Sequence, residues 1–324
     1  MDKPFDVIAL GECLVDFVCT EANGKLLMEG NPGGAPANVL AIAAKLGLST
    51  AMVCKVGKDS FGSFLRGQIA GAGIDARYVL EDSLHPTTLA IVRLNEQGNR
   101  SFTFYRNQTA DIMLHRNDLP LGAIQNARVL HFGALSLCNE PSREATFTAV
   151  QAARESGVCI SYDPNLRPPL WENLALAKQM MLRGMALAHL AKISDEELFF
   201  LTEKAEAEAV AALFKEFPLA LLAVTKGPGG CTLYTREKSY FGPAFNTPSV
   251  DTTGAGDAFW GACLTWLLEH GLNAGLPAPG ANLGELLDFA NAAGSLSTTR
   301  KGAIPAMPTR EEIMRCIATV PRLV

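Results

Sequence analysis

The chain has 324 residues, of which 48% are hydrophobic and 19% charged, with 28 Lys and Arg against 33 Asp and Glu for a net charge of −5. This length suits one large α/β domain or two smaller ones. The acidic balance argues against a general nucleic-acid binder, which needs a basic surface. The longest apolar runs, such as 219–224, fall far short of the ~20 residues that cross a bilayer, so we expect no membrane association.

The first residues predict a buried strand. The apolar run 7–10 is interrupted by Gly11 and Glu12, so it is too short for a signal-peptide core. The 8 cysteines include no Cys-x-x-Cys pair, which argues against a zinc ribbon or a thioredoxin-type site. We therefore expect reduced cysteines in the core of a cytoplasmic protein.

Strand-like and helix-like segments alternate along most of the chain. Short apolar segments of this kind, separated by helices, are typical of a parallel sheet covered on both faces. The sequence therefore predicts an α/β fold. The strands are expected at 7–10, 51–56, 129–132, 159–162, around 193 and at 221–225, and helices at 36–46, 61–70, 143–155 and 196–201.

Two segments, about 12–32 and 87–110, depart from this rhythm. Polar and apolar side chains alternate within them, and 95–99 has the composition of a hairpin turn. We interpret them as a small β-sheet lid inserted into a single domain that spans 1–324. Exposed strands leave open edges that often pair with another copy, so we expect a homodimer through the lid.

One glycine-rich turn leads directly into a predicted helix. Gly254, Ala255 and Gly256 precede Asp257 there, and the unpaired N–H groups of such a helix start can hold a phosphoryl group. Asp257 could then accept a proton from an attacking hydroxyl. The alternative, in which Asp257 is only an N-terminal helix acid and the glycines only form a turn, is equally consistent with this motif.

Two segments near the N-terminus could contact a sugar. Gly33 and Gly34 would let a ligand approach the backbone, and Asn38 lies in the first turn of the helix that follows. The Asp16 carboxylate could accept hydrogen bonds from sugar hydroxyls. Taken singly, Gly33, Gly34 and Asn38 fit a simple loop-to-helix junction at least as well, and Asp16 fits a surface acid at least as well.

Two further motifs follow predicted strands. Asp163-Pro164-Asn165-Leu166-Arg167 comes after the strand at 159–162, and a glycine-rich stretch at 225–230 comes after 221–225. Ligands of open parallel sheets bind beyond the carboxyl ends of the strands. The second motif could hold a nucleotide, although a glycine-rich hairpin explains it as well.

Taken in order, these motifs resemble the ribokinase-type (PfkB) family of sugar kinases over about residues 5–315. The matching patterns are Gly-Glu-x-x-x-Asp, Gly-Gly-x-x-x-Asn, Asp-Pro-Asn-x-Arg, Thr-x-Gly-x-x-Gly and Asp-Thr-Thr-Gly-Ala-Gly-Asp. Within the family, the chain is most similar to bacterial and plant fructokinases. The stretches that carry this likeness are 33–38, 102–106 with 110–111, 131–133, 140–141, 163–167 with 170–171, and 192–197.

The resemblance implies a three-layer α/β/α ribokinase-like fold with a β lid over the sugar. It also implies transfer of the γ-phosphoryl group of ATP to a sugar hydroxyl with Mg²⁺, fructose to fructose 6-phosphate first of all. Kinases for 2-keto-3-deoxygluconate, aminoimidazole riboside, ribose or a nucleoside are alternatives. A sugar- or nucleotide-sensing protein without turnover is an alternative from another class.

The resemblance also implies a role for each matched residue. The catalytic base is Asp257, and the anion hole is Gly254, Ala255 and Gly256. The sugar site is Asp16, Gly33, Gly34, Asn38, Phe104, Arg106 and Arg167. The nucleotide side is Asn165, Lys192, Thr225, Gly227, Gly230 and Asn291. The acid that organises Mg²⁺ through water is Glu197, and a monovalent-cation site for K⁺ comprises Asp251 and Thr253 with backbone groups of Ser297, Arg300 and Gly302.

Three positions depart from the family pattern. The magnesium motif begins with Ser194 in place of the frequent Asn, and Gly254 replaces an Ala of the usual signature. Ala306 stands where some members have a cation-binding serine, which makes activation by K⁺ less certain.

Overall fold

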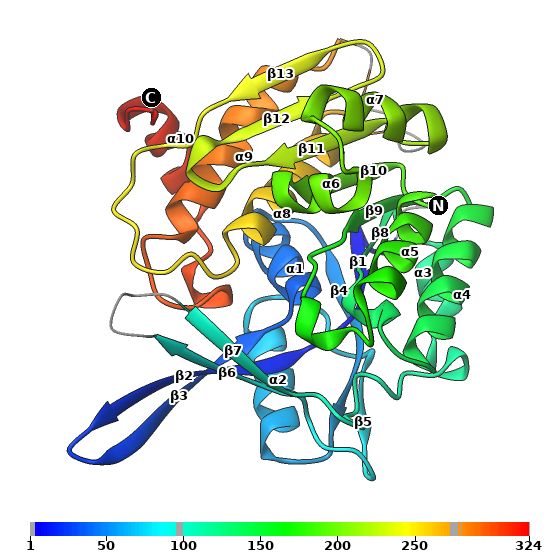
Figure 1. The fold of residues 1–324 in the computed structure, drawn as a ribbon, viewed down its shortest axis with the longest axis vertical. Coiled ribbons are helices and arrows are strands. Elements are labelled where there is room, and N and C mark those ends of the chain that lie inside the picture. Colours follow the sequence, from blue (N-terminus) through cyan, green and yellow to red (C-terminus); the bar gives the residue numbers. More distant parts are fainter. Residues whose placement is uncertain (1–3, 95–99, 273–277, 279, 324) are drawn as a thin grey trace.

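The computed structural model describes residues 4–94, 100–272, 278 and 280–323 (Figure 1). A large sheet crosses the body in the order β13-β12-β11-β10-β9-β8-β1-β4-β5. Seven strands are parallel, β12 pairs antiparallel with β11, and β13 pairs antiparallel with β12. The strands are β1 (Val7–Leu10), β4 (Thr50–Gly57), β5 (Val79–Asp82), β8 (Val129–Gly133), β9 (Cys159–Asp163), β10 (Leu190–Ser194), β11 (Leu221–Thr225), β12 (Cys231–Tyr234) and β13 (Ser239–Gly242).

Helices cover both faces of this sheet. One face packs against α1 (Ala35–Lys45), α2 (Ser60–Gly71), α8 (Ala255–Glu269), α9 (Leu283–Ser297) and α10 (Arg310–Thr319). The other face packs against α3 (Leu121–Gln125), α4 (Ser142–Glu155), α5 (Leu174–Met185), α6 (Asp195–Thr202) and α7 (Glu206–Glu216). The three-layer α/β/α prediction is confirmed.

Alternation along the strands explains how one sheet supports two cores. In β1, Val7 and Ala9 belong to the core under α1 and α8, whereas Ile8 and Leu10 belong to the opposite core. Successive side chains of a strand point to opposite faces, so a strand buried on both faces must be apolar throughout. All four residues of β1 are buried.

A smaller sheet of four strands lies beside the body, in the order β3-β2-β6-β7 (Figure 1). Its strands are β2 (Leu14–Ala22), β3 (Lys25–Gly33), β6 (Leu89–Leu94) and β7 (Arg100–Tyr105), so the predicted extra strands form this sheet. Asn23 and Gly24, with φ of 54° and 69°, make the two-residue turn of the β2–β3 hairpin. The predicted turn at 95–99 lies outside the described residues.

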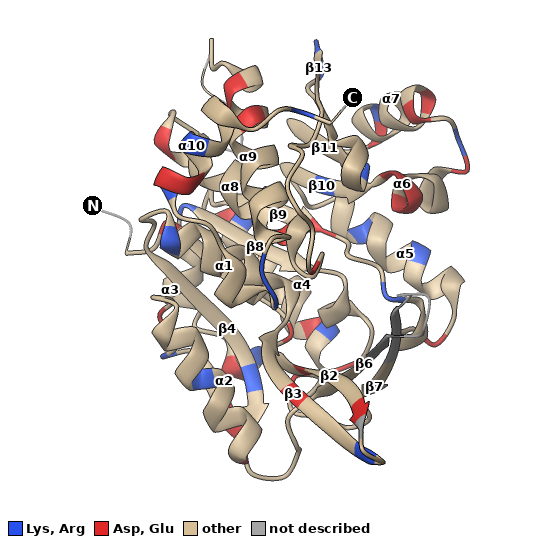
Figure 2. Ribbon diagram, turned by 90° about the vertical axis from the view of Figure 1, so that its left-hand side faces the viewer, with Lys and Arg blue, Asp and Glu red and all other residues tan. Residues whose placement is uncertain are grey.

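The outer helices carry charges of both signs, and Figure 2 shows them side by side on α10 and α7. Arg310 of α10, for example, pairs with Glu269 at the end of α8. All the cysteines are buried and unpaired, as predicted. Within the described part of the chain, no helix combines the length and apolar character needed to cross a membrane.

Candidate active site

The start of α8 is a glycine turn whose geometry suits an anion. Gly254, with φ of 75°, precedes the helix, and no side chain caps it. A Cβ at Gly254 would lie 2.7 Å from the Cβ of Ala303, so both the φ and the space require glycine. Because the first N–H groups of a helix lack intrahelical partners, this turn presents donors and the positive end of the helix dipole.

Asp257 lies in the first turn of α8 and is buried. Its Oδ2 accepts a hydrogen bond of 2.8 Å from Nδ2 of Asn38 on α1. Burial raises the pKa of Asp257 to about 6, and nearby charges act in both directions: Lys192 lowers it and Asp163 raises it. The carboxylate is therefore ionised at neutral pH and more basic than an exposed aspartate.

A cavity of about 430 Å³ opens onto Asp257, and we call it the Asp257 cavity. The small sheet contributes Asp16 from β2 and Phe104 from β7, and the loop after β9 contributes Arg167. Burial raises the pKa of Asp16 to about 6, which the charge of Arg167 opposes. Side-chain oxygen acceptors thus line the cavity from β2, α1 and α8, namely those of Asp16, Asn38 and Asp257, which suits a ligand with several hydroxyls.

The turn between β3 and α1 passes under this cavity with no room for side chains. A Cβ at Gly33 would lie 2.1 Å from Oδ2 of Asp16. Gly34 has φ of 115°, and a Cβ there would lie 2.4 Å from the carbonyl oxygen of Glu12. Gly34 and Asn38 line the cavity, whereas Gly33 lies behind Asp16.

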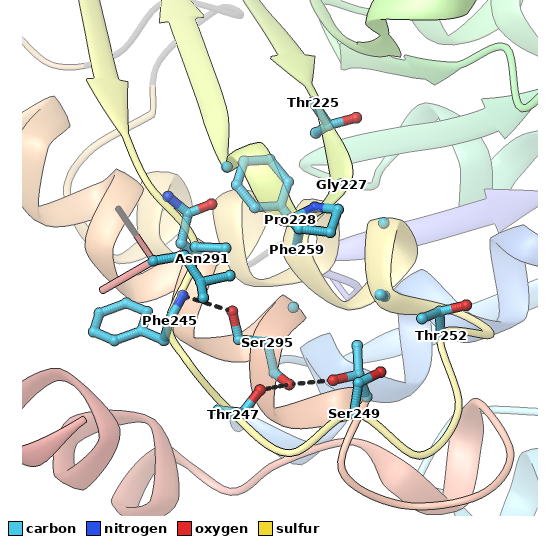
Figure 3. A pocket seen from close by; sticks show the side chains of 17 residues that line it. Thr225, Gly227, Pro228, Phe245, Thr247, Ser249, Thr252, Phe259, Asn291 and Ser295 are labelled. Carbon is cyan, nitrogen blue, oxygen red and sulfur yellow. Dashed lines mark hydrogen bonds between the residues drawn. The ribbon is translucent and has the colours of Figure 1, made fainter. Parts of the chain in front are cut away.

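A second cavity, of about 370 Å³, lies between the loop after β11 and helix α9 (Figure 3). We call it the Thr225 cavity. Four predicted nucleotide residues, Thr225, Gly227, Gly230 and Asn291, line it together. Thr252, Ala255 and Gly256 line both cavities, so the first turn of α8 separates the two.

The Thr225 cavity has apolar and polar walls. Phe245 and Phe259 line it, and the N–H of Phe245 donates to Oγ of Ser295 at 3.0 Å (Figure 3). Asn291 donates its Nδ2 to the carbonyl oxygen of Gly242 at 2.9 Å. The cavity therefore offers flat apolar surface beside fixed polar groups, which is the usual composition of a small-molecule pocket.

Lys192 brings a positive charge to the first turn of α8. Its Nζ lies 2.7 Å from Oδ2 of buried Asp163, and a Cβ at Gly256 would lie 3.0 Å from the same Nζ. Burial alone would lower the pKa of Lys192, but the Asp163 carboxylate raises it. Lys192 and Asn165 line the Asp257 cavity and are not part of the Thr225 cavity wall, which refines the prediction that grouped them with the other nucleotide residues.

Glu197 connects the end of β10 to the loop after β9. Its Oε2 accepts the N–H of Ser194 at 2.9 Å in a capping box, and its Oε1 accepts the N–H of Leu166 at 2.6 Å. Both oxygens keep a further lone pair, and the residue lines a cavity with Arg167 and Lys192. This arrangement fits an acid that binds a hydrated cation through water.

The two segments predicted to form a monovalent-cation site lie side by side. Oδ1 of Asp251 accepts the N–H of Thr253 at 2.9 Å, and its Oδ2 accepts the N–H of Gly302 at 3.0 Å. The Ser297 side chain is buried, and Arg300 pairs with Glu312. No cluster of three or more His, Cys, Asp or Glu is found in the described ranges.

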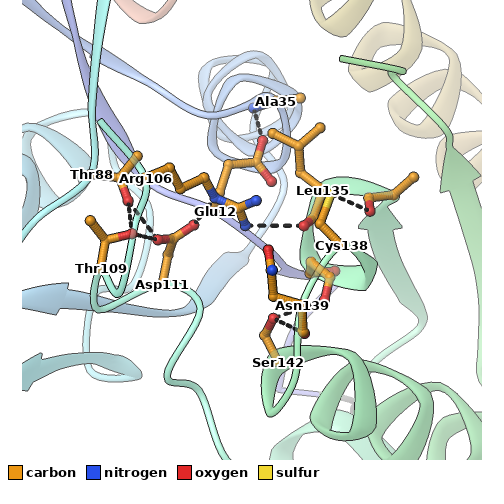
Figure 4. Close-up of polar contacts among 12 residues, drawn as sticks. Glu12, Ala35, Thr88, Arg106, Thr109, Asp111, Leu135, Cys138, Asn139 and Ser142 are labelled. Carbon is orange, nitrogen blue, oxygen red and sulfur yellow. Dashed lines mark hydrogen bonds and ion pairs between the residues drawn. The ribbon is translucent and has the colours of Figure 1, made fainter. Parts of the chain in front are cut away.

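Arg106 differs from the prediction of a pocket residue. Its side chain is 2% exposed and is not part of the Asp257 cavity wall. Nε lies 2.7 Å from Oδ2 of Asp111, and Nη2 donates to the carbonyl oxygen of Leu135 at 3.0 Å (Figure 4). The buried carboxylate of Asp111 holds the guanidinium behind the wall, because a buried charge needs a paired partner.

Three residues of the site received no role in the sequence analysis. Glu12 and Thr252 line the Asp257 cavity, and Asp163 pairs with Lys192 behind it. The signal for Asp163 was its position at the carboxyl end of a buried strand. Glu12 lies within the matched pattern Gly-Glu-x-x-x-Asp, but its surroundings come from segments far apart in the chain, so the pattern gave it no role.

The model of the pfkB carbohydrate kinase family matches residues 5–310. The chain therefore belongs to the pfkB family of carbohydrate kinases. This membership, the α/β/α body and the small sheet agree with the resemblance found in the sequence.

Three relatives illustrate the likeness. Probable fructokinase-4 of Arabidopsis thaliana is 42% identical over 95% of this chain and 95% of its own length. A crystal structure of fructokinase with bound ATP from Xylella fastidiosa has a TM-score of 0.90 and 32% identity, covering 98% of this chain and 99% of that one. A double mutant of Vibrio cholerae fructokinase with fructose, ADP and potassium ion bound has a TM-score of 0.87 and 32% identity over the same shares.

Proposed function

We propose that this protein is an ATP-dependent fructokinase that converts D-fructose to fructose 6-phosphate. The observation that carries the proposal is the meeting of two cavities at Ala255 and Gly256, one with Asp257 in its wall and one with Thr225. A sugar in the first cavity and a nucleotide in the second would face each other across the helix start. The likeness to curated fructokinases over most of the chain supports fructose as the sugar.

In this proposal the sugar lies in the Asp257 cavity. Asp16, Gly34 and Asn38 contact its hydroxyls, and Gly33 leaves room for the Asp16 carboxylate. Phe104 covers the sugar from the small sheet, which acts as the lid, and Arg167 faces the same space. Exclusion of water by such a lid limits wasteful hydrolysis of ATP.

The transfer step is a direct in-line displacement. Asp257 orients the primary hydroxyl of fructose and takes its proton as the oxygen attacks the γ-phosphorus. The N–H groups of Gly254 to Gly256 and the ammonium of Lys192 face the charge that develops on the phosphoryl oxygens. ADP leaves from the Thr225 cavity, where Gly227, Gly230 and Asn291 hold the nucleotide.

Two cation roles complete the proposal. Glu197, with its remaining lone pairs, would hold hydrated Mg²⁺, which supplies charge neutralisation to the phosphates of ATP. Asp251 and Thr253 with the backbone at Ser297, Arg300 and Gly302 would hold K⁺. The adjacency of these two segments supports the second role.

A panel of acceptors tests the function. ADP release from ATP and Mg²⁺ is measured with fructose, ribose, 2-keto-3-deoxygluconate, aminoimidazole riboside and adenosine. We expect the highest kcat/KM for fructose, with the phosphate on carbon 6 by ³¹P and ¹³C NMR. Preference for another acceptor would replace fructose in the proposal, and ATP and sugar binding without turnover with any acceptor would support the sensor alternative.

We also propose that two copies pair through their small sheets. β3 is an edge strand of its sheet, and Leu26, Leu27 and Met28 on it are exposed. Unpaired edges with exposed apolar residues favour association. Light scattering should give twice the mass of one chain, and Leu26→Lys with Met28→Lys should give one chain. The exposed Leu174 of α5 offers a control, because Leu174→Lys should keep the dimer.

A further inference from the structure

The chain passes between the large and the small sheet at residues 11–13, at 34, at 83–88 and after 105, and buried polar side chains gather there (Figure 4). We call these passages the crossings. The proposed roles of the site use none of the contacts among Glu12, Arg106 and Asp111. These three charged residues are nevertheless only 3%, 8% and 6% exposed, and burial of a charge is costly unless the charge is paired and hydrogen-bonded.

Glu12 fixes the first two crossings to each other. Its Oε1 accepts the N–H of Ala35, the first residue of α1, at 2.9 Å. The backbones touch as well, because a Cβ at Gly34 would lie 2.4 Å from the Glu12 carbonyl oxygen and one at Gly11 would lie 2.6 Å from Cγ of Pro36. A displacement of Glu12 therefore displaces the first turn of α1.

The later crossings form a second buried unit around Asp111. Its Oδ1 accepts the hydroxyls of Thr88 at 2.5 Å and Thr109 at 2.8 Å, and its Oδ2 accepts Nε of Arg106 at 2.7 Å. Arg106 directly follows β7, the strand that carries Phe104 to the cavity. This unit therefore moves with the small sheet.

Glu12 of the first unit and Arg106 of the second carry opposite charges, but no ion pair joins them among the described residues. Oε2 of Glu12 and Nη1 of Arg106 are both buried, and neither has a hydrogen-bond partner in the described part of the chain. Each charge nevertheless acts on the other: burial raises the pKa of Glu12 to about 7, and Arg106 opposes that rise. Each of these two buried polar atoms therefore carries the cost of an unmade hydrogen bond.

We propose that Glu12 is a positioning residue through which the small sheet controls the reacting end of the site. Arg106 transmits the position of β7 to the Glu12 carboxylate, and Glu12 transmits it to the first turn of α1. One turn further along α1, Asn38 holds the Asp257 carboxylate at 2.8 Å. When the small sheet covers the sugar, Asp257 would therefore lie in the position to accept the proton of the attacking hydroxyl. The inference rests on the proposed function, because it assigns Glu12 to the sugar-kinase reaction.

The test is a double-mutant cycle between Glu12→Gln and Asn38→Ala. The glutamine keeps an oxygen for the N–H of Ala35 and removes the charge that faces Arg106. We expect Glu12→Gln to lower kcat/KM for fructose by about tenfold, because loss of the attraction to Arg106 would displace the first turn of α1 and cost the hydrogen bond from Asn38 to the charged Asp257. In the double variant the two losses should not multiply, because both act through the same Asn38–Asp257 contact.

Asp118 provides the matched control. Its carboxylate accepts a backbone N–H, that of His115, at 2.8 Å and pairs with buried Lys55 at 2.6 Å, yet it lines neither the Asp257 nor the Thr225 cavity. Whatever loss Asp118→Asn causes should multiply with that of Asn38→Ala. A second variant, Arg106→Lys, keeps the positive charge but removes the guanidinium group. Its loss in kcat/KM should also not multiply with that of Glu12→Gln, because both act through the same interaction.

A second measurement does not need turnover. The carboxyl carbon of Asp257 is titrated by ¹³C NMR in the protein without ligands. Loss of the Asn38 hydrogen bond raises the pKa of the carboxyl it stabilised, so Glu12→Gln and Asn38→Ala should raise it alike. An unchanged titration in Glu12→Gln, or losses in kcat/KM that multiply, would overturn the inference. If the parent protein fails to phosphorylate fructose, the proposed function fails and the titration still decides the role of Glu12.

Discussion

At the residue scale, the proposed reaction depends on one carboxylate whose surroundings make it a better base than an exposed aspartate. Asp257 is buried beside a lysine ammonium and a second carboxylate, and it accepts a hydrogen bond from Asn38. Each neighbour has a distinct effect: Lys192 keeps the group ionised, and Asp163 opposes that. Substitutions at Asp257 therefore test charge and position separately.

Replacement of Asp257 by asparagine should remove the base and keep the shape. We expect Asp257→Asn to lower kcat by at least ~100-fold, the usual range for loss of a general base. The KM for ATP should stay within a few fold, because the nucleotide contacts lie in the Thr225 cavity. ADP release at saturating fructose measures the first value, and near-normal turnover would remove Asp257 from the role of base.

The raised pKa of Asp257 also predicts the pH dependence of the reaction. A base with a pKa of about 6 is protonated and inactive below that pH, so kcat/KM should fall tenfold per pH unit on the acid side of pH 6. Asp16 has a pKa likewise raised to about 6, so the fall would steepen toward about a hundredfold per pH unit if the ionised form of Asp16 is required as well. A profile that stays flat down to pH 5 would show that neither carboxylate needs to be ionised.

The same shift makes a prediction about stability. The pKa of Asp257 is raised from 3.8 to about 6 on folding, so the fold favours the protonated form and loses stability as the pH rises from about 4 to 6. Above pH 6 the ionised carboxyl costs on the order of 1–3 kcal/mol. Without ligands, Asp257→Asn should therefore melt a few degrees above the parent at pH 8 and equally at pH 4, by calorimetry.

At the element scale, the contact of α1 with α8 sets the distance between Asn38 and Asp257. A Cβ at Gly261 would lie 2.3 Å from Cγ2 of Ile42 and 2.5 Å from the carbonyl oxygen of Val39. Gly261→Ala should thus push the helices apart, lower the melting temperature and reduce kcat. Gly67 of α2 is the control: its Cβ would meet nothing within 4 Å, so Gly67→Ala should stabilise by about 0.5–1 kcal/mol with kcat unchanged.

How far the elements could be predicted depends on how local their signals are. The apolar strand Val7–Leu10 and the helix that follows Gly34 were predicted within a residue or two. Their signals, an apolar run and a Gly-Ala-Pro helix start, consist of residues adjacent in the sequence. The short strands β5 and β13 were missed. They contain charged or exposed residues and pair at the sheet edges, where tertiary contacts outweigh local preference.

The same division between local signals and contacts made only by the fold applies to the candidate site. Asp257 and the glycines before it were singled out because one turn of sequence contains a glycine-rich helix start with an acid in its first turn, and their roles stay predictions. Arg106 was placed at the sugar by its resemblance, but the buried partner that holds it behind the wall, Asp111, gives no sign of its burial in the sequence. Glu12 was missed because its partners lie on segments that only the fold brings together.

At the scale of the whole molecule, two sheets and two cavities converge on the first turn of α8. The large sheet supplies loops at the carboxyl ends of β9, β10 and β11, and the small sheet covers the Asp257 cavity. Ligands of open α/β sheets bind at this edge. The pairing of small sheets and the cytoplasmic location stay predictions at this scale.

The central claim is direct transfer of the phosphoryl group across that turn, from the Thr225 cavity to the Asp257 cavity. The most direct test uses ATP made chiral at the γ-phosphorus with oxygen isotopes, and reads the configuration of the sugar phosphate product. A single in-line displacement predicts inversion at phosphorus. Retention would require two displacements through a phosphorylated protein group, and would contradict direct transfer between the two cavities.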